Sequence, residues 1–129
     1  RAELMHTHIL HLEGLAHHQD DSGMWHQVID LSETYLEFSA TAMIGYSIAR
    51  GLREGWLDDE WRTIVDKAWN GIAQRITEKG ELEHVCIGTG PLATLDEYIN
   101  RPFNDGLDDR GGAMALWFAV EMARLEAGV

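Results

Sequence analysis

The sequence predicts an all-α protein built of helical hairpins, and three features of its 129 residues support that prediction. Long apolar segments alternate with amphipathic ones, only two prolines occur, and no stretch keeps the two-residue alternation of a half-buried strand. Apolar residues form 45% of the chain and charged residues 25%, as is ordinary for a globular protein. A chain of this length is expected to fold as a single domain, residues 1–129.

Charge and composition exclude several classes of partner. The chain carries 22 acidic and 10 basic residues, a formal net charge of −12, and such a surface repels nucleic-acid phosphates. No run approaches the roughly 18 apolar residues of a membrane span, so we expect neither a nucleic acid nor a membrane as a partner. The single cysteine, Cys86, excludes an internal disulfide and is typical of a reducing compartment, which predicts a cytoplasmic protein.

Residues 1–19 are expected to form an amphipathic helix that is rich in histidine. Its apolar residues share one broad face at about 100° per residue: Leu4, Met5, Ile9, Leu12, Leu15 and Ala16. A metal site needs two ligands one turn apart and a third from another element, and His8 with His11 meets that spacing only in part. Surface histidines and metal ligands both stay open for His6, His8, His11, His17 and His18. No metal or other cofactor is predicted.

A polar turn at residues 19–23 leads to a short extended stretch, residues 25–29, that begins with Trp25 and His26. In an extended strand, Gln27 would point the same way as Trp25, because side chains alternate. A tryptophan and an amide on one face of a loop suit contact with a sugar ring. The alternative is that Trp25 packs as a lid on the core.

A helix from about residue 35 to 54 is apolar on all sides, which predicts a buried inner helix. Glu37, Ser39 and Thr41 lead into it, and polar side chains at the mouth of a buried helix suit a sugar site. Glu37 would also complement the helix dipole, and the two roles are compatible. After a link capped by Asp58, residues 59–78 are expected to form an amphipathic outer helix. Together they form an αα-hairpin, and repetition of that unit indicates a helical barrel or solenoid.

The last third of the chain predicts less regular structure before a final helix. Residues 82–87 are mildly β-like, residues 88–91 form a turn, and residues 95–100 form a short helical turn. Cys86 lacks an evident base partner, which favours a packed thiol over a nucleophile. Residues 103–112 are an acidic loop that resembles a calcium loop in composition but not in spacing, so a solvated turn and a site-lining loop both stay open. Residues 113–125 are expected to form a second inner helix.

Three stretches in this order, residues 23–43, 86–90 and 104–113, resemble the C-terminal part of the unsaturated glucuronyl and unsaturated rhamnogalacturonyl hydrolases, glycoside hydrolase families 88 and 105. The resemblance implies part of an (α/α)6 barrel of six helical hairpins, a six-hairpin glycosidase. It also implies an activity: release of a 4,5-unsaturated uronic acid from an oligosaccharide by hydration of the C4=C5 vinyl ether, without a cofactor.

The resemblance covers roughly the last third of such an enzyme, and the catalytic Asp of the family belongs to the part that is missing here. We therefore expect this chain alone to be inactive. Residues 109–112 also depart from the His-Gly pair of many relatives. The residues expected to line the substrate cavity are Trp25, His26, Gln27, Glu37, Ser39, Thr41, Asn104 and Asp105.

A shortened barrel has a physical consequence. Two inner helices that are apolar all round need neighbours on every side, and a cut barrel exposes an apolar patch that self-association would cover. We expect a homo-oligomer, a dimer, packed through residues 36–48 and 113–122. The first residues read as a helix already under way, which we interpret as a partial gene or a removed tag. Two alternatives stay open: a stand-alone helical binding or assembly module, and a metal enzyme that uses the N-terminal histidines.

Overall fold

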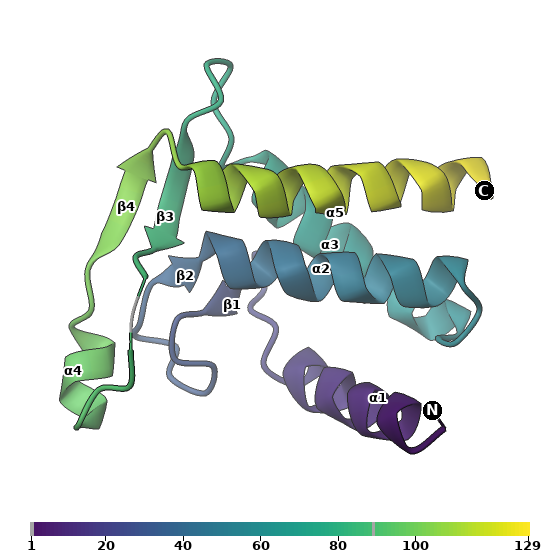
Figure 1. Cartoon of the computed structure of the whole chain (residues 1–129), viewed down its shortest axis with the longest axis horizontal. Coiled ribbons are helices and arrows are strands. Elements are labelled where there is room, and N and C mark those ends of the chain that lie inside the picture. The colour runs from purple at the N-terminus through teal and green to yellow at the C-terminus, as the bar shows by residue number, and fades with distance from the viewer. Residues whose placement is uncertain (1, 89) are drawn as a thin grey trace.

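The computed structural model describes residues 2–88 and 90–129, and helices dominate that part of the chain (Figure 1). The helices are α1 (Ala2–Ala16), α2 (Phe38–Arg53), the 3₁₀ helix η1 (Asp59–Trp61), α3 (Arg62–Ala73), α4 (Leu95–Ile99) and α5 (Asp109–Ala127). The strands are β1 (Trp25–His26), β2 (Leu36–Glu37), β3 (Leu82–Cys86) and β4 (Phe103–Gly106). The expected all-α architecture of helical hairpins is confirmed.

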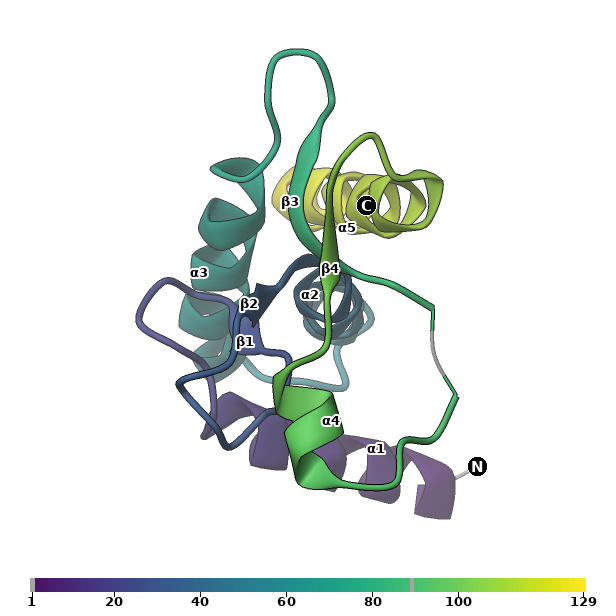
Figure 2. The same ribbon diagram turned by 90° about the vertical axis from the view of Figure 1, so that its left-hand side faces the viewer.

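Helices α2 and α5 lie side by side and run in the same direction (Figures 1 and 2). Their backbones approach closely because Gly45 of α2 faces Phe118 of α5, where a Cβ atom would lie 2.3 Å from Phe118 Cζ. Phe118 is fully buried, as are Phe38 and Ile48 on α2. The two segments expected as inner helices therefore form the centre of the fold.

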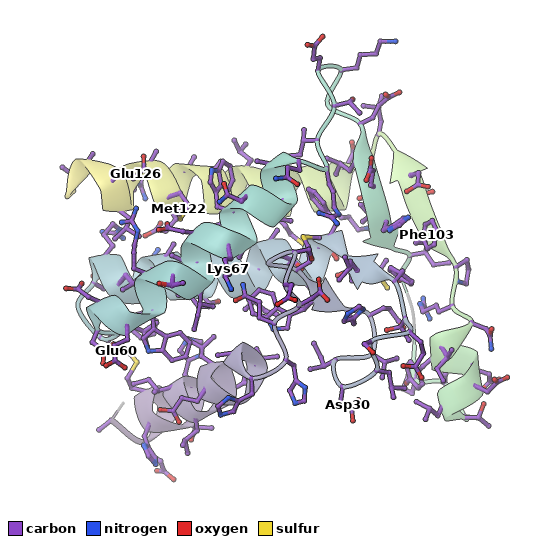
Figure 3. The ribbon with its side chains drawn as sticks, turned by 180° about the vertical axis from the view of Figure 1, so that it is seen from behind. Asp30, Glu60, Lys67, Phe103, Met122 and Glu126 are labelled. Carbon is purple, nitrogen blue, oxygen red and sulfur yellow. The ribbon has the colours of Figure 1, made fainter. Side chains whose placement is uncertain are left out.

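Helix α3 completes a hairpin with α2 and covers it from outside. Asp58 precedes η1 and its side chain accepts a hydrogen bond from the Glu60 amide, so the expected cap is confirmed. One face of α3 is buried, while Lys67 points outward, as the view from behind shows (Figure 3). The helix ends at Ala73 and not near Glu78, because the chain turns there and Ile76 pairs with Leu82.

Two short antiparallel sheets fix the chain at the beginning of α2. Strands β1 and β2 pair Trp25 with Glu37, and β3 and β4 pair Cys86 with Phe103. Strand β4 lies where the sequence predicts an irregular loop, so that prediction is wrong for residues 103–106. Helix α5 also begins at Asp109, earlier than expected, because the Asp108 side chain accepts a hydrogen bond from the Gly111 amide and caps the helix.

Helix α1 lies at the edge of the molecule and ends at Ala16, three residues before the predicted end. Of its apolar face only Leu12 is buried, while Leu4 and Leu10 are exposed. Its C-terminal end is held by a hydrogen bond from the Trp25 indole Nε1 to the Leu15 carbonyl, 2.7 Å. The helix is thus an attached layer rather than part of the core.

Helix α5 is apolar all round, as expected, but is buried on one side only. Its outer face carries an apolar stripe of Leu116, Trp117 and Val120, which are 63%, 58% and 43% exposed. We call these three residues the α5 stripe. No helix of the described residues combines the length and apolarity needed to cross a bilayer.

Candidate functional site

A cleft of about 420 Å³ opens beside the beginning of α2. The loop after β1, the first turns of α2, the end of β3 and the first turns of α5 all contribute to its walls. Four of the eight residues expected from the sequence line it, namely His26, Gln27, Glu37 and Ser39. The remaining lining residues are Ile29, Ala40, Met43, Cys86 and Met114.

Glu37 is the only carboxylate among the described residues that line the cleft, and backbone and hydroxyl donors occupy both of its oxygens. Oε1 accepts from the Ser39 amide (3.0 Å), the Ser39 hydroxyl (2.8 Å) and the Cys86 amide (2.8 Å). Oε2 accepts from the Ala40 amide. The carboxylate therefore caps α2, as the dipole interpretation expected, and also fastens the end of β3 to it. Glu37 is 3% exposed and positions the cleft wall.

Gln27 lines the cleft and has an unsatisfied side-chain oxygen. Its backbone amide donates to the Tyr35 carbonyl (2.8 Å), but its side-chain Oε1 is buried and has no hydrogen-bond donor among the residues that the structure describes. A buried carbonyl without a donor costs roughly 1–3 kcal/mol.

His26 also lines the cleft, and a backbone carbonyl fixes its ring. Its Nδ1 is 2.7 Å from the Thr34 carbonyl, which can only accept, so Nδ1 carries the hydrogen. Nε2 then faces Asp20, 3.5 Å from Oδ2. The pKa of Asp20 is lowered, first by hydrogen bonds from Ser22 and then by His26.

Trp25 and Thr41 lie beneath the cleft and not in it, since both are fully buried. The Trp25 amide donates to the Thr41 hydroxyl (3.0 Å), which donates in turn to the Glu37 carbonyl (2.7 Å). Stacking on a sugar needs an exposed ring face, and Trp25 offers none. Of the two interpretations of Trp25, the structure supports the lid on the core.

Asn104 and Asp105 are not brought to the cleft. Asp105 accepts a hydrogen bond from the His84 amide (2.7 Å) and borders a separate hollow beside β3 and β4. The Asn104 side chain donates to Asp108 (3.3 Å) near the start of α5. Neither residue is among those that line the 420 Å³ cleft, so their expected contact with the substrate stays a prediction.

Five residues that line the cleft are not among the expected site residues: Ile29, Ala40, Met43, Cys86 and Met114. Cys86 lies at the cleft because its backbone amide donates a hydrogen bond to Glu37. The neighbouring Tyr35 has a raised pKa, first because its hydroxyl is buried and then because of Cys86 and Glu37. Apolar side chains at helical spacing do not distinguish a cleft wall from a core. Only the way the beginnings of α2 and α5 meet reveals them.

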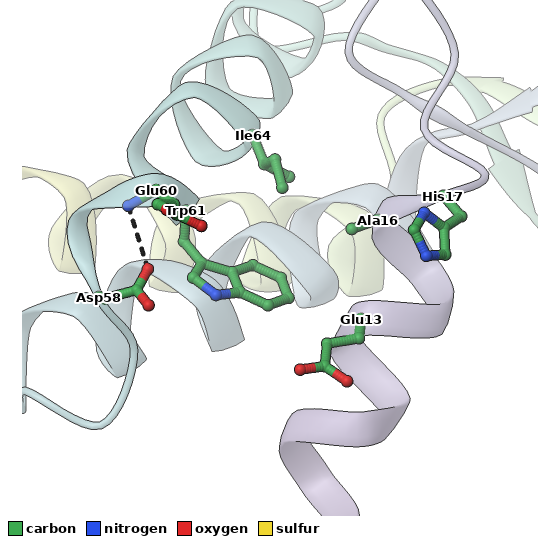
Figure 4. A pocket seen from close by; sticks show the side chains of 7 residues that line it. All are labelled: Glu13, Ala16, His17, Asp58, Glu60, Trp61 and Ile64. Atoms are coloured by element: carbon green, nitrogen blue, oxygen red, sulfur yellow. Dashed lines mark hydrogen bonds between the residues drawn. The ribbon is translucent and has the colours of Figure 1, made fainter.

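A larger hollow lies elsewhere, between α1 and the beginning of α3. It measures about 480 Å³ and includes Glu13, His17 and Trp61, and none of the expected site residues (Figure 4). Asp58 also lines it, but that carboxylate already caps η1. In residues 2–88 and 90–129 no three His, Cys, Asp or Glu side chains are grouped so that they could hold a metal ion.

Comparison with known families finds a match that covers almost the whole chain. Residues 1–126 match the model of Glycosyl Hydrolase Family 88. The chain is also 28% identical, over 113 residues, to the unsaturated rhamnogalacturonyl hydrolase YesR of Bacillus subtilis, and that match covers 88% of this chain and 31% of the relative.

Solved structures show the same likeness. A possible member of the GH105 family from Salmonella enterica serovar Paratyphi A superposes with a TM-score of 0.82 at 34% identity. A possible member of that family from Klebsiella pneumoniae also gives 0.82, at 36% identity. Each match covers 92% of this chain and 30% of the solved one. The chain therefore spans about a third of the length of these relatives.

Proposed function

Because the chain belongs to Glycosyl Hydrolase Family 88, we propose that it supplies one wall of the carbohydrate cleft of an unsaturated uronyl hydrolase. Such an enzyme releases a 4,5-unsaturated uronic acid from an oligosaccharide by hydrating the C4=C5 vinyl ether. The similarity to an unsaturated rhamnogalacturonyl hydrolase supports this substrate class. We place the chain, as a single domain, in the C-terminal portion of the six-hairpin barrel.

The unsatisfied Oε1 of Gln27 is the observation that carries the proposal. Gln27 lines the cleft together with the polar residues His26, Glu37, Ser39 and Cys86, and its Oε1 is buried there without a donor among the described residues. A sugar presents several hydroxyl groups, each able to donate a hydrogen bond. A hydroxyl bound at Gln27 would satisfy the buried carbonyl and fix the orientation of the ring.

The chain alone is expected to lack hydrolase activity. Protonation of a double bond needs a carboxylic acid that can give up a proton to the substrate. Glu37 is engaged by backbone and hydroxyl donors, and Asp105 lies outside the cleft. The chemistry therefore requires an acid from another part of the complete enzyme, and the described cleft contributes binding.

Two readouts on one sample test this proposal. An unsaturated galacturonyl–rhamnose disaccharide is added to the ¹⁵N-labelled chain, and its ultraviolet absorbance is followed because hydration destroys the absorbing double bond. We expect constant absorbance and shifts of the amide signals of Gln27 and Ser39. Gln27→Ala should abolish the shifts, whereas Gln74→Ala, at an exposed glutamine after α3, should not. Loss of absorbance, or shifts that survive Gln27→Ala, would contradict the proposal.

The α5 stripe supports a second candidate, the assembly module. We propose that a second copy of the chain covers Leu116, Trp117 and Val120 and forms a dimer, since contiguous exposed apolar residues mark association surfaces. The stripe replaces the broader interface expected from the sequence, because Phe38, Ala42 and Ile48 of α2 are already buried within one copy. Sedimentation velocity at micromolar concentration should show a dimer, and Trp117→Asp should yield a monomer. We further propose a cytoplasmic location, supported by the single cysteine.

A further inference from the structure

We propose that Arg110 binds the carboxylate of an acidic sugar at the mouth of the cleft. The inference rests on the proposed function, because it assigns a residue of this chain to the anionic group of that ligand class. No pattern in the sequence assigns Arg110 such a role.

Arg110 lies against the backbone that leaves the cleft. It is the second residue of α5, and its guanidinium lies over Gly88, where a Cβ atom would be 2.8 Å from Nη1. Gly88 follows the cleft residue Cys86 by two positions. The start of α5 lies beside β3 in both views of the ribbon, and Gly111 packs against Leu82 and Val85 of that strand (Figures 1 and 2).

The position of Arg110 on α5 also brings it near the cleft. Met114 lines the cleft, and it follows Arg110 by four residues, or about one turn of α5. Residues four apart share a helix face. Arg110 does not line the cleft itself, but it lies next to two segments that do, the end of β3 through Gly88 and the beginning of α5 through Met114.

The charge of Arg110 is available to a ligand. In the described ranges 2–88 and 90–129, no carboxylate lies within 4 Å of its guanidinium, whereas other arginines on the helices have acidic partners: Arg50, Arg53, Arg62 and Arg124. Asp109 directly precedes Arg110, and it is among the described carboxylates that stay beyond 4 Å. Asp108, two positions before Arg110, has both oxygens engaged, Oδ1 by the Gly111 amide and Oδ2 by Asn104. Arg110 is also exposed.

An available guanidinium is unusual on a chain with a formal net charge of −12. The surrounding negative charge disfavours anionic ligands, so a cleft for an acidic sugar needs a local cation. The guanidinium presents planar donors that match a carboxylate with two parallel hydrogen bonds. Arg110 satisfies that need at the mouth of the cleft.

Two ligands with the same sugar rings, one charged and one neutral, test whether the carboxylate contributes to binding. Digalacturonate and its dimethyl ester share the same two sugar rings, but the ester replaces each charged carboxylate by a neutral methyl ester. Their binding to the full chain is measured by isothermal titration. We expect the acid to bind roughly tenfold more tightly than the ester, as a charge-assisted hydrogen bond predicts. Arg110→Gln should remove this preference and leave ester binding unchanged. Arg124→Gln, at the far end of the same helix, should keep the preference.

A second variant tests the position of the charge. Gly88→Ala retains Arg110 but places a methyl group at its guanidinium, so the preference for the acid should shrink. An acid preference that survives in Arg110→Gln would overturn the inference and leave the proposed function intact. No binding of either ligand would overturn both. Inorganic phosphate that competes as well as digalacturonate would identify a general anion site and overturn the assignment to an acidic sugar.

Discussion

Arg53 and Glu121 form a buried ion pair between the C-terminal turn of α2 and the middle of α5, with Nε and Oε1 2.5 Å apart. The two residues are 68 positions apart in sequence, and Glu121 is 1% exposed. The hydrogen bond from Arg53 to Glu121 raises the pKa of Arg53 above its usual value. Together with the contact of Gly45 and Phe118, this pair fixes how the two inner helices lie against each other.

Breaking the pair from either side should have unequal effects. Arg53→Met leaves a buried carboxylate without its main partner, whereas Glu121→Gln leaves an arginine that reaches solvent. We expect Arg53→Met to lower the urea midpoint more than Glu121→Gln. The double variant should be more stable than the sum of the single losses implies. Equal decreases in the urea midpoint of the two single variants would contradict the idea that the burial of Glu121 determines the cost of breaking the pair.

The close approach at Gly45 should be intolerant of a methyl group. A Cβ atom there would lie 2.3 Å from the Phe118 ring, so Gly45→Ala should cost about 1–3 kcal/mol of unfolding free energy through overpacking. Gly14 of α1 is the matched control, since a Cβ atom at that position would have open space within 4 Å. Gly14→Ala should stabilise its helix by roughly 0.5–1 kcal/mol. Chemical denaturation of both variants checks the prediction, and a neutral Gly45→Ala would contradict the close packing of the two helices.

Glu37→Gln should destabilise the protein without a change in side-chain volume. The side-chain NH₂ group of the glutamine would face the backbone amides of Ser39, Ala40 and Cys86. Because those amides are donors too, some of their hydrogen bonds would be lost. Because hydrogen bonds to a charged acceptor are lost, we expect the free energy of unfolding to fall by roughly 2–3 kcal/mol. Urea denaturation measures it, with Glu60→Gln as a control at an exposed carboxylate. In the amide spectrum, Cys86 should shift most among β3 residues, and an unperturbed Cys86 would contradict the link between β3 and α2.

Asp108 should make the stability of the chain sensitive to acid. The Gly111 amide, then Asn104 and Arg110, lower its pKa below the usual value of 3.8. Because the pKa of Asp108 is lower in the folded state, its ionised carboxylate stabilises the fold fully above about pH 4. That contribution to stability is lost as the pH falls through the folded pKa. Urea midpoints from pH 5 to pH 2.5 should therefore fall less in Asp108→Asn than in the original chain. Asp109→Asn should keep the original pH dependence, and identical profiles for all three proteins would contradict the role of Asp108.

Local patterns predicted the helices well because they depend on residues close in sequence. The all-round apolar segments became α2 and α5, and Asp58 caps the next helix as expected. Strand β4 was missed because residues 103–106 contain Asn, Asp and Gly, which are poor strand formers, and pair with a strand some twenty residues earlier. Such pairing is not encoded in a local pattern.

The site was predictable only in part for a related physical reason. His26, Gln27, Glu37 and Ser39 lie close to one another in sequence at the entrance of α2, and the structure keeps them together. Side-chain direction is a tertiary property, so the burial of Trp25 and the position of Asp105 at a separate hollow could not be read from residue type. The resemblance to a glycosidase family identified the right region but not which side chains face the cleft.

Because α1 lies at the edge of the molecule, its amides should be less protected from hydrogen exchange than those of α2 and α5. Only Leu12 of this helix enters the core, and Gln19 and the Trp25 indole hold its end by hydrogen bonds to backbone carbonyls. Local opening of α1 therefore exposes little apolar surface, whereas opening of α2 or α5 dismantles the centre of the fold. In native-state hydrogen exchange, the amides of α1 should exchange by detachment of this helix, long before those of the inner pair exchange by global unfolding.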